Sequence, residues 1–116
     1  MGTDNVVLTK SFDFALTVIK LYKDLVAKKE FVLSRQILRS GTSIGANVEE
    51  AQGAQTRKDF HSKMTIAYKE ARETHYWLRL LKESGLGSAD CSKCLKDVEE
   101  LSRILASITR TTKSSR

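Results

Sequence analysis

The chain has 116 residues, of which 41 % are hydrophobic and 29 % charged, a composition that fits one globular domain with a modest core. No apolar run approaches the ~20 residues of a membrane span, and the N-terminus lacks the basic-then-apolar pattern of a secretory signal. We therefore expect a cytoplasmic protein without membrane contact. The formal charge of +6 favours anionic partners such as nucleic acid, although basic and acidic residues alternate along the chain.

Two features of the sequence predict an all-α fold. It contains no proline, and apolar residues recur at helical spacing in four segments separated by short connectors. Short connectors place consecutive helices side by side, which predicts an antiparallel up-down-up-down four-helix bundle. The bundle is expected over residues 11–111, with an extended or frayed segment over 1–10 and a basic, frayed tail over 112–116.

The first predicted helix, residues 11–29, carries more apolar surface than a single core requires. It is expected to begin at Ser11, whose hydroxyl can cap it. Two apolar stripes lie side by side at 100° per residue, whereas an ordinary surface helix needs an apolar arc only slightly wider than that. The excess must be buried by a second neighbour, either inside the bundle or in another copy of the chain, and we assign the second stripe to a contact between copies. The first stripe comprises Phe12, Ala15, Leu16, Ile19 and Val26, and the second comprises Phe14, Val18, Leu21 and Leu25.

The second predicted helix, residues 33–53 with Ser34 as its cap, contains two glycines one turn apart, Gly41 and Gly45. Each interior glycine costs a helix about 1 kcal/mol relative to alanine. A helix that accepts two of them is expected to lie close to another helix. The core line predicted for this helix is Ile37, Gly41, Ile44, Val48 and Ala51.

The third and fourth helices are predicted over residues 57–84 and 88–111. Thr56 with Asp59 resembles a capping box, and Gly85 is expected to end the third helix. A second apolar flank of the third helix suits either the core or a contact between copies, and we favour the contact. The core positions are Phe60, Met64, Ala67, Ala71, Thr74, Leu78 and Leu81 on the third helix, with Cys91, Cys94, Val98, Leu101, Leu105 and Ile108 on the fourth; the flank is Ile66, Trp77 and Leu80.

The residues offer little support for catalysis or metal binding. Cys91 and Cys94 form a CxxC pair, but they lie on an inward seam, and the spacing of His61 and His75 does not match a zinc site. The Glu-x-x-His pairs of di-iron bundles are absent, and no arrangement of nucleophile and base stands out. We predict a non-enzymatic protein without catalytic residues, metal or cofactor.

Basic residues on two helices are the candidate binding groups. Lysine and arginine contact phosphates, and an exposed tyrosine can stack on a base. The alternatives are a solvated helix face and, for the arginines of the second helix, ion pairs with Glu49 or Glu50. The candidates are Lys58, Lys69, Arg72, Tyr76 and Arg79 on one side of the third helix, with Arg35 and Arg39 on the second.

Several of these segments together resemble a known family, the 23S rRNA-intervening sequence proteins. The resemblance covers roughly residues 8–108 and is carried by Ser11-Phe-Asp-Phe-Ala15, Arg39-Ser-Gly-Thr-Ser-Ile-Gly-Ala-Asn-Val-Glu-Glu-Ala51, Ala67-Tyr-Lys-Glu-Ala71 and Glu73-Thr-His-Tyr-Trp-Leu78. It implies a small bacterial four-helix bundle that assembles into a homo-oligomeric ring, with a homopentamer as the expected size, and no established catalytic residues. The motif positions Gly41, Ser43, Gly45, Asn47 and Glu50 are interpreted as packing and helix-pairing positions.

Two functions are consistent with these observations. The first is an oligomeric bundle that contacts RNA or another nucleic acid through its basic helix faces. The second is a homo-oligomeric interaction scaffold or accessory subunit for a partner enzyme. The resemblance suggests a reverse transcriptase as that partner, because a related bundle is the accessory protein of diversity-generating retroelements.

Overall fold

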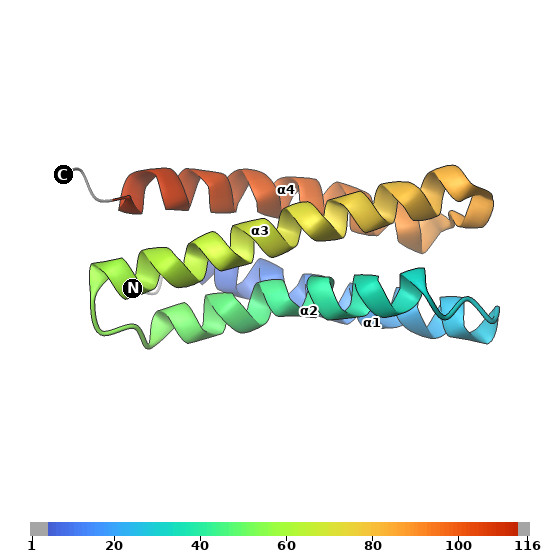
Figure 1. Ribbon diagram of the computed structural model, residues 1–116, viewed down its shortest axis with the longest axis horizontal. Helices are drawn as coiled ribbons and strands as arrows, with labels where there is room; N and C mark the ends of the chain where they lie inside the picture. Colours follow the sequence, from blue (N-terminus) through green and yellow to red (C-terminus); the bar gives the residue numbers. More distant parts are fainter. Residues whose placement is uncertain (1–4, 114–116) are drawn as a thin grey trace.

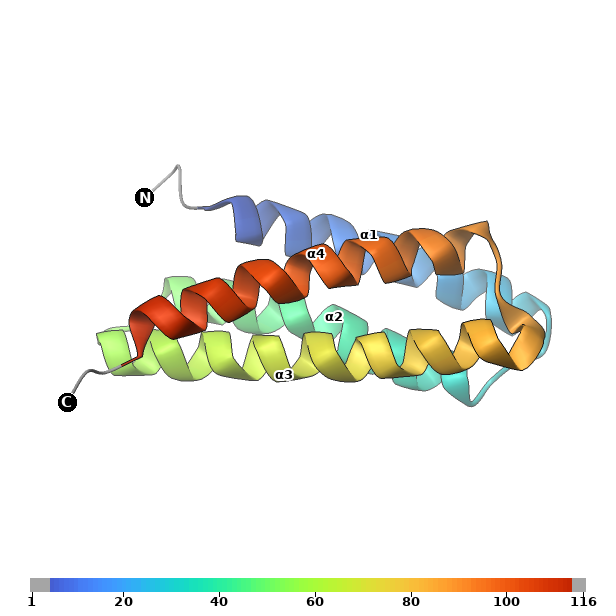
Figure 2. The ribbon, with the colours of Figure 1, turned by 90° about the horizontal axis from the view of Figure 1, so that it is seen from above.

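Four long helices lie side by side in the computed structural model, which describes residues 5–113 (Figure 1). They are α1 (Val6–Ala27), α2 (Leu33–Gln52), α3 (Arg57–Leu81) and α4 (Ala89–Thr112), and a π-helical turn, η2 (Lys82–Leu86), extends α3. Consecutive helices run in opposite directions along a body of 48 × 23 × 21 Å (Figures 1 and 2). The all-α prediction is confirmed, and residues 5–113 contain no strand.

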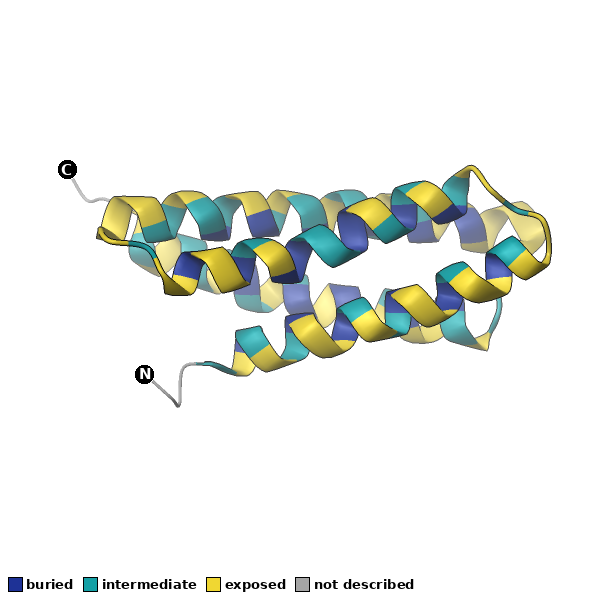
Figure 3. Ribbon diagram, turned by 90° about the horizontal axis from the view of Figure 1, so that it is seen from below, coloured by how far each residue is buried: buried dark blue, intermediate teal, exposed yellow. Residues whose placement is uncertain are grey.

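Each helix packs against two neighbours, in the order α1, α2, α3, α4 around the bundle, and the seam between α4 and α1 is the least extensive. The buried positions of every helix face the common interior, while exposed positions follow the outer sides (Figure 3). This arrangement gives the molecule four seams between adjacent helices, which include the α2–α3 seam and the α3–α4 seam.

The first helix begins earlier than predicted. α1 starts at Val6, so the prediction of an extended or frayed segment is wrong for residues 6–10; residues 1–4 lie outside the described part. Val7 is buried, which shows that the apolar pattern continues upstream of Ser11. Ser11 is therefore a buried residue inside the helix, and its hydroxyl donates to the carbonyl oxygen of Leu8 at 3.2 Å. At the other end, α4 reaches Thr112, and residues 114–116 of the predicted tail are outside the described part.

The connector between α1 and α2 contains a C-terminal cap for α1 and an N-terminal cap for α2. Lys29 adopts a left-handed φ of 67°, and the N–H groups of Lys29 and Glu30 donate to the carbonyls of Val26 and Leu25, closing α1 with a Schellman motif. The Glu30 carboxylate then caps α2 by accepting from the backbone N–H groups of residues 32, 33 and 34 at 3.1, 2.9 and 2.7 Å. The predicted cap, Ser34, instead lies inside the helix.

Hydrogen bonds decide the protonation of Glu30. Partial burial by itself would raise the pKa of its carboxyl group, but the three backbone donors and the Ser34 hydroxyl outweigh burial and lower the pKa below its ordinary value of 4.5. The ionised form is thus favoured in the folded chain.

Side-chain hydroxyls cap the other two helices, at Thr56 as predicted and at Ser88, the residue at which the fourth helix was predicted to begin. The Thr56 hydroxyl accepts from the backbone N–H of Asp59 at 3.0 Å, and the Ser88 hydroxyl accepts from that of Cys91 at 3.2 Å. Gly85 adopts a φ of 87°, a conformation that glycine adopts without strain, and it ends the helical path of α3 and η2 as predicted.

The core uses the second apolar stripe of α1, which corrects the predicted contact between copies. Phe14, Val18, Leu21 and Leu25 are at most 2 % exposed within the single chain, so they are unavailable to another copy. The first stripe remains outside instead, with Phe12 58 % and Leu16 54 % exposed. Adjacent stripes of similar composition cannot be told apart by periodicity, and contact with α2 decides between them.

That contact is made at the two glycines of α2, as predicted. A methyl group on Gly41 would stand 2.9 Å from Cγ2 of Val18, and one on Gly45 would stand 3.2 Å from the carbonyl oxygen of Ser11. Ordinary carbon contacts are about 3.5–4.0 Å. The missing side chains therefore allow α1 to lie against α2 on the side that carries Ser11 and Val18.

Removing the Glu30 cap should weaken the fold in a pH-dependent way. Glu30→Ala is expected to lower the free energy of unfolding by about 1 kcal/mol, the usual cost of losing a helix cap. Because the folded-state pKa is lowered, the contribution of Glu30 is full above about pH 5 and is lost as pH falls through the folded pKa. Urea unfolding should show a steeper acid loss in the parent chain than in Glu30→Gln; equal slopes would contradict the assignment.

Gly41→Ala should destabilise the bundle although it raises helix propensity. The added methyl meets Val18, a stiff, fully buried β-branched side chain. Overpacking of this kind costs about 1–3 kcal/mol and exceeds the ~1 kcal/mol gained from propensity. Thermal unfolding of Gly41→Ala, Val18→Ala and the double variant should show a loss smaller than the sum of the single losses. Gly53→Ala, whose methyl would meet only the Glu50 carbonyl oxygen at 3.8 Å, is the control and should be nearly neutral.

Candidate nucleic-acid interface

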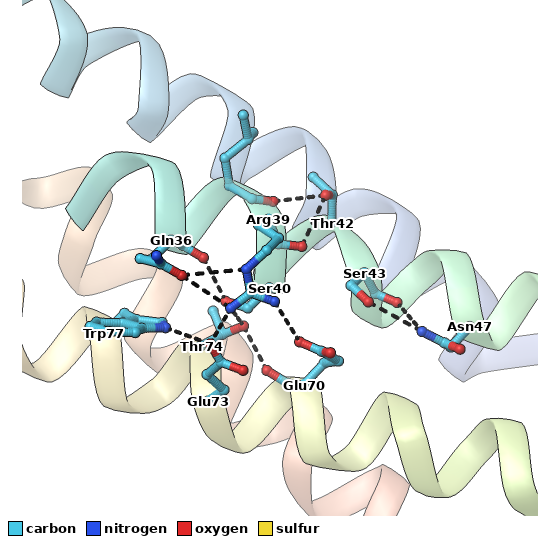
Figure 4. Close-up of polar contacts among 11 residues, drawn as sticks. Gln36, Arg39, Ser40, Thr42, Ser43, Asn47, Glu70, Glu73, Thr74 and Trp77 are labelled. Atoms are coloured by element: carbon cyan, nitrogen blue, oxygen red, sulfur yellow. Dashed lines mark hydrogen bonds and ion pairs between the residues drawn. The ribbon is translucent and has the colours of Figure 1, made fainter. Parts of the chain in front are cut away.

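The α2–α3 seam holds Arg39 in ion pairs within the chain (Figure 4). Its guanidinium contacts the Glu73 carboxylate directly and lies 3.6 Å from an oxygen of Glu70. The Trp77 indole N–H donates to the same Glu73 carboxylate at 2.9 Å. Arg39 was predicted as a nucleic-acid contact, but the alternative of an ion pair is what the structure shows, with Glu70 and Glu73 rather than Glu49 or Glu50 as partners.

Other polar residues of the central motif are also satisfied locally. The hydroxyls of Ser40 and Thr74 meet at 2.8 Å in the buried part of the seam. Asn47 donates its amide N–H groups to the backbone carbonyl and the hydroxyl of Ser43, at 2.9 and 3.2 Å. The Ser40–Thr74 hydrogen bond joins α2 to α3, whereas the Asn47–Ser43 hydrogen bonds lie within α2.

The α3–α4 seam has the opposite character, because it gathers cations into an open groove of about 460 Å³. Arg72 and Arg79 reach it from α3, and Arg103 reaches it from α4. The one acidic residue of its lining, Glu99, lies 3.1 Å from Nε2 of His75. The groove is lined by Tyr68, Arg72, His75, Arg79, Glu99, Ser102 and Arg103.

The same seam continues toward the start of α3, where a second basic hollow of about 930 Å³ lies against the end of α4. Lys58 lines it, as does Arg57, whose guanidinium donates to the carbonyl oxygen of Thr111 at 2.9 Å. His61 and Thr112 also line this hollow, and Nδ1 of His61 lies 2.9 Å from the Thr112 hydroxyl. Cationic groups therefore border both ends of the α3–α4 seam.

Of the seven predicted binding residues, the structure places Arg72 and Arg79 in the groove and Lys58 in the second hollow. Lys69 and Tyr76 are exposed on α3 at the level of the groove without lining it, whereas Arg35 and Arg39 lie on α2, which does not border this seam. Within residues 5–113 the α3 cations Lys69, Arg72 and Arg79 form no ion pair, so their charge is available to a ligand.

The α4 side of the groove was missed in the sequence. Arg103 lines the groove. It belongs to an exposed series with Lys96 and Arg110, which do not line the groove and which recur every seven residues on one side of α4 at steps of about 10 Å. This seven-residue spacing lies on the side of α4 opposite the inward Cys91–Leu105 seam. It is the sequence signal that indicates these basic residues. Acidic neighbours at 97, 99 and 100 dilute the local charge and obscure this spacing in the sequence.

Two exposed apolar surfaces remain. On α1, Phe12 and Ala15 border a hollow toward α2 that includes Thr42, Gly45 and Ala46. Leu16 is exposed on the same helix but does not line this hollow. On α3, Ile66 is 41 % and Leu80 39 % exposed. Trp77, predicted with them, is only partly exposed and packs against the core.

The thiols and acidic groups give no sign of a reactive centre. Burial raises the pKa of both cysteines, that of Cys94 to about 12, so neither forms the thiolate needed for nucleophilic or redox chemistry near neutral pH. No group of three or more histidine, cysteine, aspartate or glutamate side chains within residues 5–113 is placed to hold a metal ion. None of the helices in that range has the length and apolar character needed to cross a membrane.

Comparison with known proteins agrees with the architecture. The profile of the 23S rRNA-intervening sequence protein family matches residues 3–107. The crystal structure of a protein of unknown function from the S23 ribosomal protein family of Bacteroides thetaiotaomicron VPI-5482 is 50 % identical and has a TM-score of 0.86. The match covers 90 % of this chain and 98 % of that one. No curated protein matches the sequence.

The bundle architecture and the polar α2 motif thus define a small all-α helical-bundle protein. The chain belongs to the 23S rRNA-intervening sequence protein family.

Proposed function

We propose that this protein binds RNA through the face formed by α3 and α4, as a non-enzymatic contact. The observation that carries the proposal is the groove in which Arg72, Arg79 and Arg103 converge, with a single lining carboxylate that lies against His75. Guanidinium groups suit phosphate oxygens, which they can bind in bidentate fashion. The family name links its members to 23S rRNA-intervening sequences, which makes RNA the first ligand to test.

Binding of this kind is mainly electrostatic. The cations of the α3–α4 face come from helix surfaces, and a helix face of lysine and arginine positions a phosphate backbone without reading base identity. Each neutralised phosphate releases counterions, so affinity falls steeply as salt rises. We therefore expect low sequence specificity and strong salt dependence.

We further propose that copies of the chain associate through the exposed apolar surfaces. These surfaces lie on α1 and α3, which occupy opposite corners of the bundle, and a contact between two different patches is heterologous. Heterologous contacts close into rings when the rotation allows it. The resemblance to ring-forming relatives suggests five copies, and such a ring would multiply weak phosphate contacts.

The rival function is a scaffold for a partner enzyme. It is favoured by the exposed α1 stripe, since an apolar surface flanked by small residues also suits a partner helix. A scaffold would hold its partner at high salt and show no affinity for RNA, so salt dependence separates the two functions.

Reversing the charge of the groove should abolish RNA binding. The triple variant Arg72→Glu/Arg79→Glu/Arg103→Glu is expected to lower affinity for a short labelled RNA at least about 100-fold at low salt, because three phosphate contacts become repulsive. Fluorescence anisotropy over a salt series measures this, and the parent chain should give a linear fall of log affinity with log salt.

A control with the same change in net charge separates the groove from overall charge. Lys23, Lys28 and Lys29 are exposed near the end of α1 and form no ion pair within residues 5–113. Their replacement by glutamate should cause a much smaller loss. Equal losses in the two triple variants, or parent affinity that ignores salt, would refute the proposal.

Placing charge on the α1 stripe should dissociate the assembly. Leu16→Glu/Ile19→Glu alters exposed side chains, so the bundle should keep its helical circular dichroism while the mass falls toward the 13.0 kDa of one chain. Light scattering at high protein concentration measures the mass. Ser107→Glu, an exposed change on α4, is the control. A parent chain that stays at the monomer mass would contradict self-association.

A further inference from the structure

We infer that the α3–α4 face prefers single-stranded over double-helical nucleic acid, an inference that rests on the proposed RNA binding and names its ligand class. It comes from two tyrosines, Tyr68 and Tyr76, which stand among the cations of this face. Aromatic rings beside cations are the combination that proteins use to hold unpaired strands, with cations on the phosphates and rings on the bases.

Tyr76 offers a stacking surface that is exposed and held in place. Its side chain is 48 % exposed on the outer face of α3. The Arg79 guanidinium carbon lies 5.9 Å from the centre of its ring, and the Trp77 ring meets it edge to face with centroids 5.1 Å apart. These two contacts orient the ring before any ligand arrives, which lowers the entropy lost on binding.

The contacts that hold the Tyr76 ring in place continue into the α2–α3 seam. Trp77 is fixed by its hydrogen bond to Glu73, and Glu73 is fixed in turn by Arg39. The Arg39 ion pair therefore has an indirect part in the binding face, as the anchor of the indole against which the tyrosine ring rests. Arg39 is in this sense a positioning residue and not a ligand contact.

Tyr68 repeats the arrangement on the groove side of α3. The guanidinium carbon of Arg72 lies 5.9 Å from its ring centre, and Tyr68 itself lines the α3–α4 groove. Eight residues separate the two tyrosines, or about 12 Å along the helix. Each ring thus has its own arginine, but Tyr68 is partly buried against the core, so Tyr76 is the more accessible stacking surface for a strand that follows α3.

A double helix could not use these rings. Its bases are paired and stacked inside, the major groove of an RNA duplex is deep and narrow, and the shallow minor groove offers hydroxyls and base edges to a protein surface. Duplex binding would rely on the cations alone, whereas an unpaired strand adds stacking on tyrosine. The duplex carries the higher charge density, so the preference should emerge at moderate salt, where the electrostatic contribution has weakened.

The test compares an unstructured single-stranded RNA with a duplex of the same length by fluorescence anisotropy at moderate salt, using the full chain. Tyr76→Leu removes the ring and keeps every charge, while Tyr76→Phe keeps the ring and is the matched control. The parent chain should bind the single strand about tenfold more tightly, Tyr76→Leu should lose about tenfold for the single strand only, and Tyr76→Phe should match the parent. Trp77, the single tryptophan of the chain, gives a second readout, because a base stacked on Tyr76 should quench its emission.

The outcomes are distinct. Parent affinity that is equal or higher for the duplex, or a Tyr76→Leu variant that binds the single strand as well as the parent does, would overturn the single-strand inference and leave RNA binding intact. A parent chain that binds neither RNA at low salt would overturn the proposed function itself, and the inference with it.

Discussion

The close approach of α2 to α1 is the constraint on which the surface of this molecule depends. Because Gly41 and Gly45 have no side chains, Val18 and the backbone of Ser11 occupy the space that a Cβ atom would take at those positions. This contact fixes the rotation of α1 about its own axis. Phe14, Leu21 and Leu25 then point inward, while Phe12, Leu16 and Ile19 are left outside. Two small residues on one helix thereby decide which apolar surface the neighbouring helix presents to other molecules.

The α3 helix separates its charges between its two seams. Its acidic residues Glu70 and Glu73 turn toward α2, where Arg39 takes them up in ion pairs. Its arginines at 72 and 79 turn toward α4, where they meet Arg103. Acidic and basic residues alternate along the chain, but residues that are adjacent in sequence point to different sides of a helix. The basic residues can therefore still form a locally cationic groove. Net charge alone understates the binding potential of such a surface.

The sequence was sufficient for properties that depend on local pattern and insufficient for those that depend on which faces meet. Helix number, the Thr56 cap, the turn at Gly85 and the close contact at Gly41 each have a local signature, and each agrees with the structure. The Glu30 cap was missed because glutamate seldom caps a helix from outside it, and the start of α1 was placed late because Ser11 is a favourable capping residue. The buried stripe of α1 and the part of Arg103 in the groove could not be deduced, since both require knowing the rotation of one helix against another.

The geometry of the bundle also bears on whether association and RNA binding can coexist. The apolar stripe of α1 faces the α2 side, whereas the basic groove lies between α3 and α4, so an assembly that covers the α1 stripe need not cover the groove. On α3 the exposed apolar residues lie closer to the basic residues around the helix. At 100° per residue, Tyr76 lies about 40° from Arg72 on one side and about 40° from Leu80 on the other. Tyr76 therefore lies at the border between the surface proposed for association, which includes Leu80, and the surface proposed for RNA. A strand that stacks on this ring would contact both, and its affinity should then depend on assembly even where the cations alone do not.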